Sequence, residues 1–213
     1  MNINRSNKII AALPKGKLLA PAFAKLKIAG YEFSDTEKRS RKLIIADTSK
    51  SVRVLFVKPS DVPIYVEHGI ADFGIVGRDS LVESCVDVFE PLELDFGRCG
   101  LAIAGYPRDE NHDWRLRSSV RVATKYPNIA RWYFDKLGVQ AEIIALHGSV
   151  ELGVLAGLAD VIVDIVETGT TLKENGLTVF EEILPVTAIF IINKASHKLK
   201  LHELDRIVSA IKG

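Results

Sequence analysis

The segment ADVIVDIVETGTTLKENGL (Ala159–Leu177) joins an apolar run to a polar loop and then to a short stretch with helical character. The apolar run up to Asp164 predicts a buried strand, and Gly176 predicts the end of the helix. A strand that leads through a loop into a helix is the repeating unit of α/β proteins. The segment therefore predicts an α/β fold with a polar loop at the carboxyl end of a strand.

Short runs rich in Ile and Val alternate with helix-period segments along the rest of the chain. Because strands that alternate with helices favour parallel pairing, we expect largely parallel sheets. A polar connector at 107–119 separates two such series, which predicts two lobes with a cleft between them. Predicted strands lie at 8–13, 42–47, 52–57, 71–77, 101–106, 120–124, 141–146 and 160–166. Predicted helices lie at 17–30, 60–69, 127–138 and 149–157, a long apolar run ends at 193, and a terminal helix covers 196–213.

The predicted lobes divide the chain unequally. We expect residues 1–99, completed by 184–213, to form the first lobe. Residues 100–183 form the second lobe, which carries the polar loop.

Composition and charge narrow the classes of function. The formal net charge is +1 and no block of basic residues is present, which argues against a nucleic-acid partner. Cys85 and Cys99 have no CxxC spacing, so a reduced, intracellular protein is expected. The N-terminal apolar run is too short for a signal peptide or a membrane span. We therefore expect a cytoplasmic protein with no membrane partner.

The polar loop combines groups that bind phosphate with groups that bind hydroxyls. Backbone N–H groups and hydroxyls suitable for a phosphate monoester come from four consecutive residues: Thr168, Gly169, Thr170 and Thr171. The carboxylates of Asp164 and Glu167 suit hydroxyl groups or a bridging Mg²⁺. A ribose with a 5-phosphate and free 2- and 3-hydroxyls combines these needs. The alternative is an ordinary strand-to-helix turn in which Thr168 or Thr170 caps the helix.

Nearly the whole chain resembles one enzyme family. The segment ELGVLAGLADVIVDIVETGTTL (151–172) is similar to the signature region of the ATP phosphoribosyltransferases, which open histidine biosynthesis. The match is carried by Glu151, Gly157, Ala159, Ile162, Asp164, Thr168, Gly169, Thr171 and Leu172. The segments ALPKGKL (12–18), KPSDVPIYVEHGIADFGIVGRDSL (58–81), LDFGRC (94–99) and HGSVELG (147–153) resemble the same family.

The resemblance implies a fold, a reaction and a partner. The family fold has two α/β lobes that resemble a type II periplasmic binding protein. The reaction joins ATP to phosphoribosyl pyrophosphate (PRPP), giving N1-(5-phosphoribosyl)-ATP and pyrophosphate. It requires Mg²⁺, which we expect to arrive with the substrate, since no metal-binding cluster of protein residues is visible. Because the chain ends at Gly213, we expect a short-form enzyme that forms a hetero-oligomer with a regulatory subunit related to histidyl-tRNA synthetase.

The resemblance also implies roles for individual residues. PRPP would be bound by Glu151, Asp164, Thr168, Gly169, Thr170 and Thr171, with Asp164 and Glu167 acting in catalysis. Polyphosphate and ATP would be bound by Lys15, Gly16, Lys17, Lys58 and Gly77. The family usually has arginine at Lys17, and many relatives have it at Lys58, so these lysines keep the charge without the bidentate geometry. A solvated turn at 14–17 and an ordinary glycine turn at 74–77 are the alternatives.

Two other functions are compatible with parts of this pattern. A non-catalytic protein that binds a phosphate or sugar ligand could share the two-lobe fold, because function depends on the site rather than on the fold. Phosphoribosyltransferases of the more common fold also place an acidic pair before a phosphate loop. The segments at 14–17 and 60–77 favour the ATP phosphoribosyltransferases over this second alternative.

Overall fold

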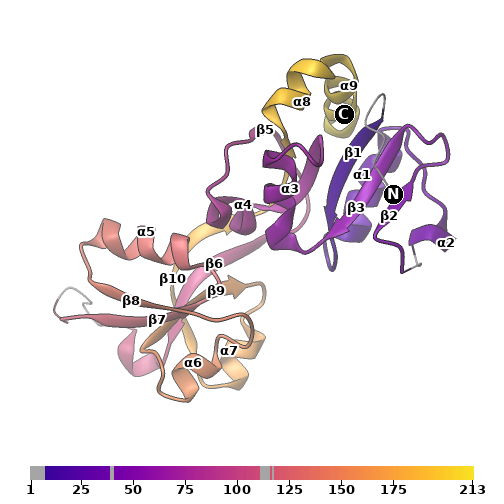
Figure 1. Ribbon diagram of the computed structural model, residues 1–213. Helices are drawn as coiled ribbons and strands as arrows, with labels where there is room; N and C mark the ends of the chain where they lie inside the picture. Colours follow the sequence, from indigo (N-terminus) through magenta and orange to yellow (C-terminus); the bar gives the residue numbers. More distant parts are fainter. Residues whose placement is uncertain (1–7, 39–40, 111–115, 117) are drawn as a thin grey trace. The chain divides into compact units, whose positions relative to one another are not determined.

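The structure is a computed structural model that describes residues 8–38, 41–110, 116 and 118–213 (Figure 1). The chain divides into two compact units. Unit 1 consists of Met1–Gly97 and Thr187–Gly213, and unit 2 consists of Arg98–Val186. Unit 2 is thus continuous in sequence, whereas unit 1 is assembled from both ends of the chain.

Unit 1 is built on a mixed sheet that has six strands in the described residues, in the order β2-β3-β1-β4-β11-β5. The neighbours β3, β1 and β4 are parallel, and the remaining pairs are antiparallel. The strands are β1 (Ile9–Pro14), β2 (Ile44–Ala46), β3 (Val52–Val57), β4 (Phe73–Gly77), β5 (Phe89–Glu93) and β11 (Ala188–Ile192). The helices are α1 (Leu19–Ile28), α2 (Asp35–Lys38), η1 (Pro59–Asp61), α3 (Val62–Glu67), α4 (Arg78–Ser84), α8 (Lys194–Leu199) and α9 (Leu201–Lys212).

Alternation along β1 shows that both faces of this sheet are buried. Ile9, Ala11 and Leu13 pack in a cluster that contains residues of α1 and α9, while Ile10 and Ala12 pack in a cluster with residues of α3 and α4. Successive side chains of a strand point to opposite faces, so each helix pair covers one face. A strand buried on both sides is apolar throughout, which explains why the short runs in the sequence have no polar alternation.

Unit 2 repeats this plan with a sheet of five strands in the described residues, in the order β10-β6-β9-β7-β8. Here β9, β7 and β8 are parallel, whereas β6 is antiparallel to both of its neighbours. One face is covered by α5 and the other by α6 and α7 (Figure 1). The strands are β6 (Cys99–Gly105), β7 (Val120–Thr124), β8 (Ala141–Ala145), β9 (Val161–Val166) and β10 (Thr178–Val186). The helices are η2 (Pro107–Asp109), α5 (Pro127–Leu137), α6 (Leu152–Leu155) and α7 (Thr170–Glu174).

The α/β prediction is confirmed, with parallel strands grouped side by side and antiparallel strands beside them. Two predicted helices differ from those observed. The helix predicted at 149–157 is reduced to α6, because Gly157 takes a left-handed φ of +74° and the Ala159 N–H bonds to the Gly153 carbonyl at 2.8 Å. The terminal helix is divided at Lys200 into α8 and α9.

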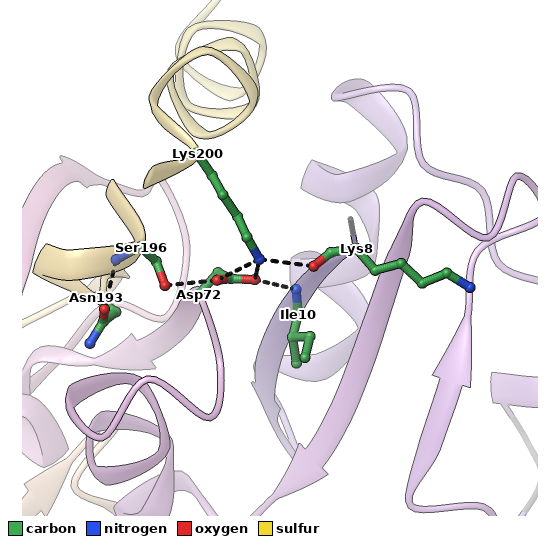
Figure 2. A network of polar contacts seen from close by, with 6 residues as sticks. All are labelled: Lys8, Ile10, Asp72, Asn193, Ser196 and Lys200. Carbon is green, nitrogen blue, oxygen red and sulfur yellow. Dashed lines mark hydrogen bonds and ion pairs between the residues drawn. The ribbon is translucent and has the colours of Figure 1, made fainter. Parts of the chain in front are cut away.

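A buried carboxylate explains the break at Lys200. Asp72, which precedes β4, is only 5% exposed. Its oxygens accept hydrogen bonds from the Lys200 ammonium at 2.9 and 2.8 Å, from Ser196 Oγ at 2.7 Å and from the Ile10 N–H at 2.8 Å (Figure 2). The ammonium also donates to the Lys8 carbonyl at 2.9 Å. The network therefore attaches the α8–α9 junction to the amino ends of β1 and β4, and Asp72 has a structural role.

Within the described ranges, none of the helices has both the length and the apolar character that crossing a bilayer requires.

Candidate active site

In unit 1, the predicted polyphosphate-binding residues follow neighbouring parallel strands. Lys15, Gly16 and Lys17 come directly after β1, Lys58 comes directly after β3, and Gly77 is the last residue of β4. The order β3-β1-β4 and the parallel register place these three strand ends at the same edge of the sheet. The Lys15 N–H donates to the Val57 carbonyl at 3.0 Å, which joins the first two ends directly.

The glycines at this edge differ in what surrounds them. Gly16 has a φ of +103° and open space where a Cβ would lie, so its turn requires glycine and leaves the backbone accessible. A Cβ on Gly77 would meet the Asp79 carboxylate at 2.2 Å, and one on Gly74 would meet Val62 Cγ1 at 2.7 Å. Gly74 is therefore explained by the packing of α3 on β4. Gly77 makes room for the Asp79 side chain at the start of α4.

In unit 2, the predicted PRPP-binding residues other than Asp164 follow β8 and β9, and β7 lies between these two strands. All three strands are parallel, so their carboxyl ends share one edge. Glu151 precedes α6, and its neighbour Val150 is buried in the same cluster as Ile162 of β9. The structure thus places the segment containing Glu151 and the loop after β9 at the same edge, on the same face of the sheet.

Asp164 lies within β9 rather than at its end, because the strand continues to Val166. Alternation sets its direction: Val163 packs in the cluster under α5, whereas Ile162 packs in the cluster under α6 and α7. Asp164 therefore points to the α6–α7 face. One carboxylate oxygen accepts the Ile165 N–H at 2.9 Å, and the side chain is partly exposed.

The loop after β9 is organised by its threonines and by one glycine. Thr168 Oγ1 and Thr170 Oγ1 are 2.9 Å apart and share a hydrogen bond. Gly169 takes a left-handed φ of +70° and immediately precedes α7, a helix of five residues. Leu172, 5% exposed, anchors that helix on the sheet. The loop hydroxyls are exposed, so they are accessible to a ligand while the residue that holds the loop is buried.

Two contacts that the sequence analysis did not predict hold β9 against β7. At the start of β9, Arg121 donates to Asp160 from its backbone N–H at 2.9 Å and from its guanidinium at 3.0 Å, and this hydrogen bond and charge raise the pKa of Arg121. In the middle of β9, the buried Thr124 hydroxyl donates to the Val163 carbonyl at 2.7 Å. Both contacts fix the position of the strand that carries Asp164. Their partners are 39 residues apart, so only the strand order reveals them.

A pocket of about 350 Å³ adjoins the loop within unit 2. Glu167, Thr168 and Gly169 form one of its sides. Glu182 of β10 lines it as well. This residue was not predicted, because the segment before 193 was interpreted as one apolar run. In the sequence, the adjacent acids Glu181 and Glu182 interrupt that run and could have indicated a functional residue. Their side chains point to opposite faces of an edge strand.

The fold is that of two-unit α/β proteins, and a loop of acids, threonines and glycine after a parallel strand is typical of proteins that bind phosphorylated sugars. A family model described as ATP phosphoribosyltransferase matches residues 58–213. An ATP phosphoribosyltransferase of Anoxybacillus flavithermus is 49% identical over 95% of this chain and 93% of its own length. One of Bacillus subtilis is 48% identical over 94% of this chain and 92% of its own length. Among solved structures, the ATP phosphoribosyl transferase (HisG:HisZ) complex from Thermotoga maritima matches with a TM-score of 0.82 and 33% identity, covering 96% of each chain.

The chain therefore belongs to the ATP phosphoribosyltransferase family. The predictions of the family, of a transferase and of the first step of histidine biosynthesis are confirmed. The predicted two-lobe fold is confirmed by the likeness to the Thermotoga maritima structure. A non-catalytic binding protein and a phosphoribosyltransferase of another fold are both set aside.

Proposed function

We propose that the loop Glu167–Thr171 binds the 5-phosphate of PRPP and that Asp164 and Glu151 bind its ribose hydroxyls. The assignment is supported by a shared edge of the sheet. Asp164 and the segment containing Glu151 lie on the α6–α7 face, at the edge where the loop leaves β9. Because α7 has only five residues, its dipole is weak. The phosphate is then held by individual N–H groups and by the Thr168 and Thr171 hydroxyls.

These residues act mainly by positioning the donor. N1 of adenine displaces pyrophosphate at C1 of the ribose, and the transition state has oxocarbenium character. Such a step needs orientation and charge stabilisation more than a covalent nucleophile. Asp164 and Glu167 supply negative charge beside the ring that becomes positive, and the phosphate contacts fix the direction in which C1 faces.

The lysines of unit 1 are proposed to bind polyphosphate. Lys15, Lys17 and Lys58 are exposed at one sheet edge, beside the accessible backbone of Gly16. An ammonium donates charge-assisted hydrogen bonds to phosphate oxygens, and three of them at one edge suit a ligand with several phosphates. Gly77 is proposed to bind through its backbone, and its lack of a side chain also leaves space for Asp79 at the start of α4.

We propose that Mg²⁺ reaches the site bound to the substrate. Within the described residues, His, Cys, Asp and Glu side chains do not gather in groups of three or more that could hold a metal ion. Mg²⁺ commonly keeps several waters and binds through substrate phosphates with one or two carboxylates, and such an arrangement fits the single acids Asp164 and Glu167. The ion would shield the pyrophosphate oxygens as the C1–O bond breaks.

A regulatory partner is also proposed. The related Thermotoga maritima structure is a HisG:HisZ complex, which supports a hetero-oligomer for this chain too. A regulatory subunit related to histidyl-tRNA synthetase remains the predicted partner, and a cytoplasmic location remains a prediction from the sequence.

A crystal soaked with PRPP and Mg²⁺ tests the donor site. We expect the 5-phosphate against Thr168–Thr171 and the ribose hydroxyls facing Asp164. PRPP lodged elsewhere, with this loop empty, would overturn the assignment. Pyrophosphate release from ATP and PRPP, measured with and without the regulatory subunit, tests the partner: a rate that does not change on addition of the subunit contradicts it.

A further inference from the structure

The pocket of about 350 Å³ in unit 2 has the size and lining of a site for a small flat ligand. Its volume lies at the lower end of the range of roughly 300–1,000 Å³ that small-ligand pockets occupy. Gly100 and Ala102 of β6 form a floor with almost no side chain. Val166, Leu172 and Val179 add apolar walls from β9, α7 and β10.

The strand register places a carboxylate on each side of this floor. Ala102 pairs with Glu182 of β10 on one side and with Asp164 of β9 on the other. Paired residues of neighbouring strands face the same way, so both acids point to the face on which α7 lies. With neighbouring strands about 4.8 Å apart, their Cα atoms are separated by about 10 Å. Asp164 is already assigned to the ribose, which leaves Glu182 facing the pocket.

The Glu182 side chain is exposed, so its carboxylate is accessible to a ligand in the pocket. A Cβ on Gly100 would lie 3.0 Å from the Glu182 carboxyl group, so the side chain extends over the floor. In the part of the chain that the structure describes, the Glu182 side chain makes no hydrogen bond or ion pair, while its backbone pairs with Ala102 in the sheet. Its neighbour Glu181 points to the other face and accepts the Tyr133 hydroxyl at 2.7 Å. An ionised carboxylate only accepts hydrogen bonds, so a ligand beside Glu182 must present N–H or O–H donors.

We propose that this pocket holds the purine ring of ATP and that Glu182 accepts a hydrogen bond from the 6-amino group, which makes it a specificity-determining residue. The inference rests on the proposed donor site, because Glu167, Thr168 and Gly169 form a side of the pocket and set a bound ring beside the ribose. The apolar walls suit the faces of a purine, and the small floor leaves room for its edge.

The chemistry of the transfer gives the carboxylate a second effect. The N1 lone pair forms the bond to C1 while the C1–O bond breaks and its electron pair leaves with pyrophosphate. Positive charge then spreads over N1, C6 and the 6-amino nitrogen until a proton leaves that nitrogen for solvent. A carboxylate at the amino group stabilises this charge as it develops.

The test compares ATP with purine riboside triphosphate, which lacks the 6-amino group, by calorimetric binding to the full chain. Wild type should prefer ATP by about 10- to 100-fold, the range expected for a hydrogen bond to a charged group. Glu182→Ala should abolish this preference while PRPP affinity stays unchanged. The ratio is the readout, because the loss of one negative charge affects both triphosphates alike. Glu181→Gln, which changes the same charge on the opposite face, should keep the preference.

A preference that survives in Glu182→Ala, or equal weakening of both nucleotides with the ratio intact, would overturn the inference. Thr178→Phe gives a second measurement, since Thr178 lines the pocket at the edge strand and a phenyl ring there would fill it. This variant should weaken both nucleotides by more than it weakens PRPP, whose loop forms one side of the pocket, and full nucleotide affinity would also overturn the inference. An error in the proposed PRPP site is recognised separately, because it would appear in the measured PRPP affinity and not in the ratio of the two nucleotide affinities.

Discussion

Asp72 and Lys200 are 128 residues apart in the chain, yet the Lys200 ammonium donates to both oxygens of the Asp72 carboxylate, at 2.9 and 2.8 Å. The carboxylate is buried, and its other bonds reach α8 and β1. One contact thus joins the last part of unit 1 to be synthesised with two of its earlier strands. It lies at the opposite end of β1 from the lysines proposed to bind polyphosphate.

Lys200→Met should lower the free energy of unfolding of unit 1 by about 3 kcal/mol, because it leaves the Asp72 charge buried without its ion-pair partner. Urea unfolding followed by circular dichroism measures the loss. Lys198→Met is the matched control on the exposed side of α8 and should change stability by less than about 0.5 kcal/mol. Equal stability of the two variants would contradict the role given to the network.

The double variant Thr168→Ala, Thr171→Ala should weaken PRPP binding by roughly 10- to 100-fold, since two hydroxyl donors to a charged phosphate are lost. ATP binding should fall less than PRPP binding, because Thr168 only borders the proposed purine pocket and Thr171 does not line it. Calorimetric titration of each ligand checks this, with the exposed Thr36→Ala in unit 1 as the control. Equal losses for PRPP and ATP would exclude a phosphate site specific to the donor.

Asp164→Asn should reduce kcat by about 100-fold, because the negative charge beside the developing oxocarbenium ion is removed. The fold should persist, since the amide oxygen can still accept the Ile165 N–H. Steady-state kinetics and thermal unfolding separate the two effects. Unchanged kinetics would contradict the placing of Asp164 at the ribose.

Lys17→Ala should raise the KM for ATP by about 10-fold, and the difference from wild type should shrink at high salt, where exposed charges are screened. Lys17→Arg should retain affinity because the charge remains. Lys27, whose side chain is 72% exposed on α1, provides the control. A Lys27→Ala effect as large as that of Lys17→Ala would point to general charge rather than to a site.

Tyr133→Phe should change how stability depends on alkaline pH. Burial raises the pKa of Tyr133, and the hydrogen bond to Glu181 raises it further. The native state therefore keeps its phenol proton above the unfolded pKa of about 10, where the unfolded chain releases it. Stability is full below about pH 10 and falls above it, by up to about 1.4 kcal/mol per pH unit. Urea unfolding from pH 8 to pH 11.5 should show a shallower fall in the variant, and parallel curves would contradict this.

Much of the fold could be predicted because buried parallel strands form short apolar runs, as at 52–57 and 120–124. What escaped prediction depends on partners far away in the chain. No local signal divides the terminal helix at Lys200, because Asp72 causes the break. Helix α4 and strand β5 were missed, since β5 is largely exposed and has two glutamates in five residues.

The candidate site shows the same limit. The loop 167–171 and the segment PKGK could be recognised from residue types alone. The row Glu182–Ala102–Asp164 could not, because it depends on the register of three strands, one of them antiparallel to both others. Irregularities in β10, on either side of Glu182, make that register impossible to count from the sequence.

Strand β11 lies between β4 and β5 in the sheet of unit 1, although the chain reaches it only after unit 2 has been completed. On the ribosome, Arg98–Val186 can close as soon as it emerges, because all its strands are already present. The strands of unit 1 that are translated earlier lack the strand between β4 and β5 until Ala188–Ile192 has been synthesised. The half of the enzyme that is translated first is therefore the last to mature, and a transcript truncated near codon 186 would yield one folded half and one exposed, aggregation-prone sheet edge.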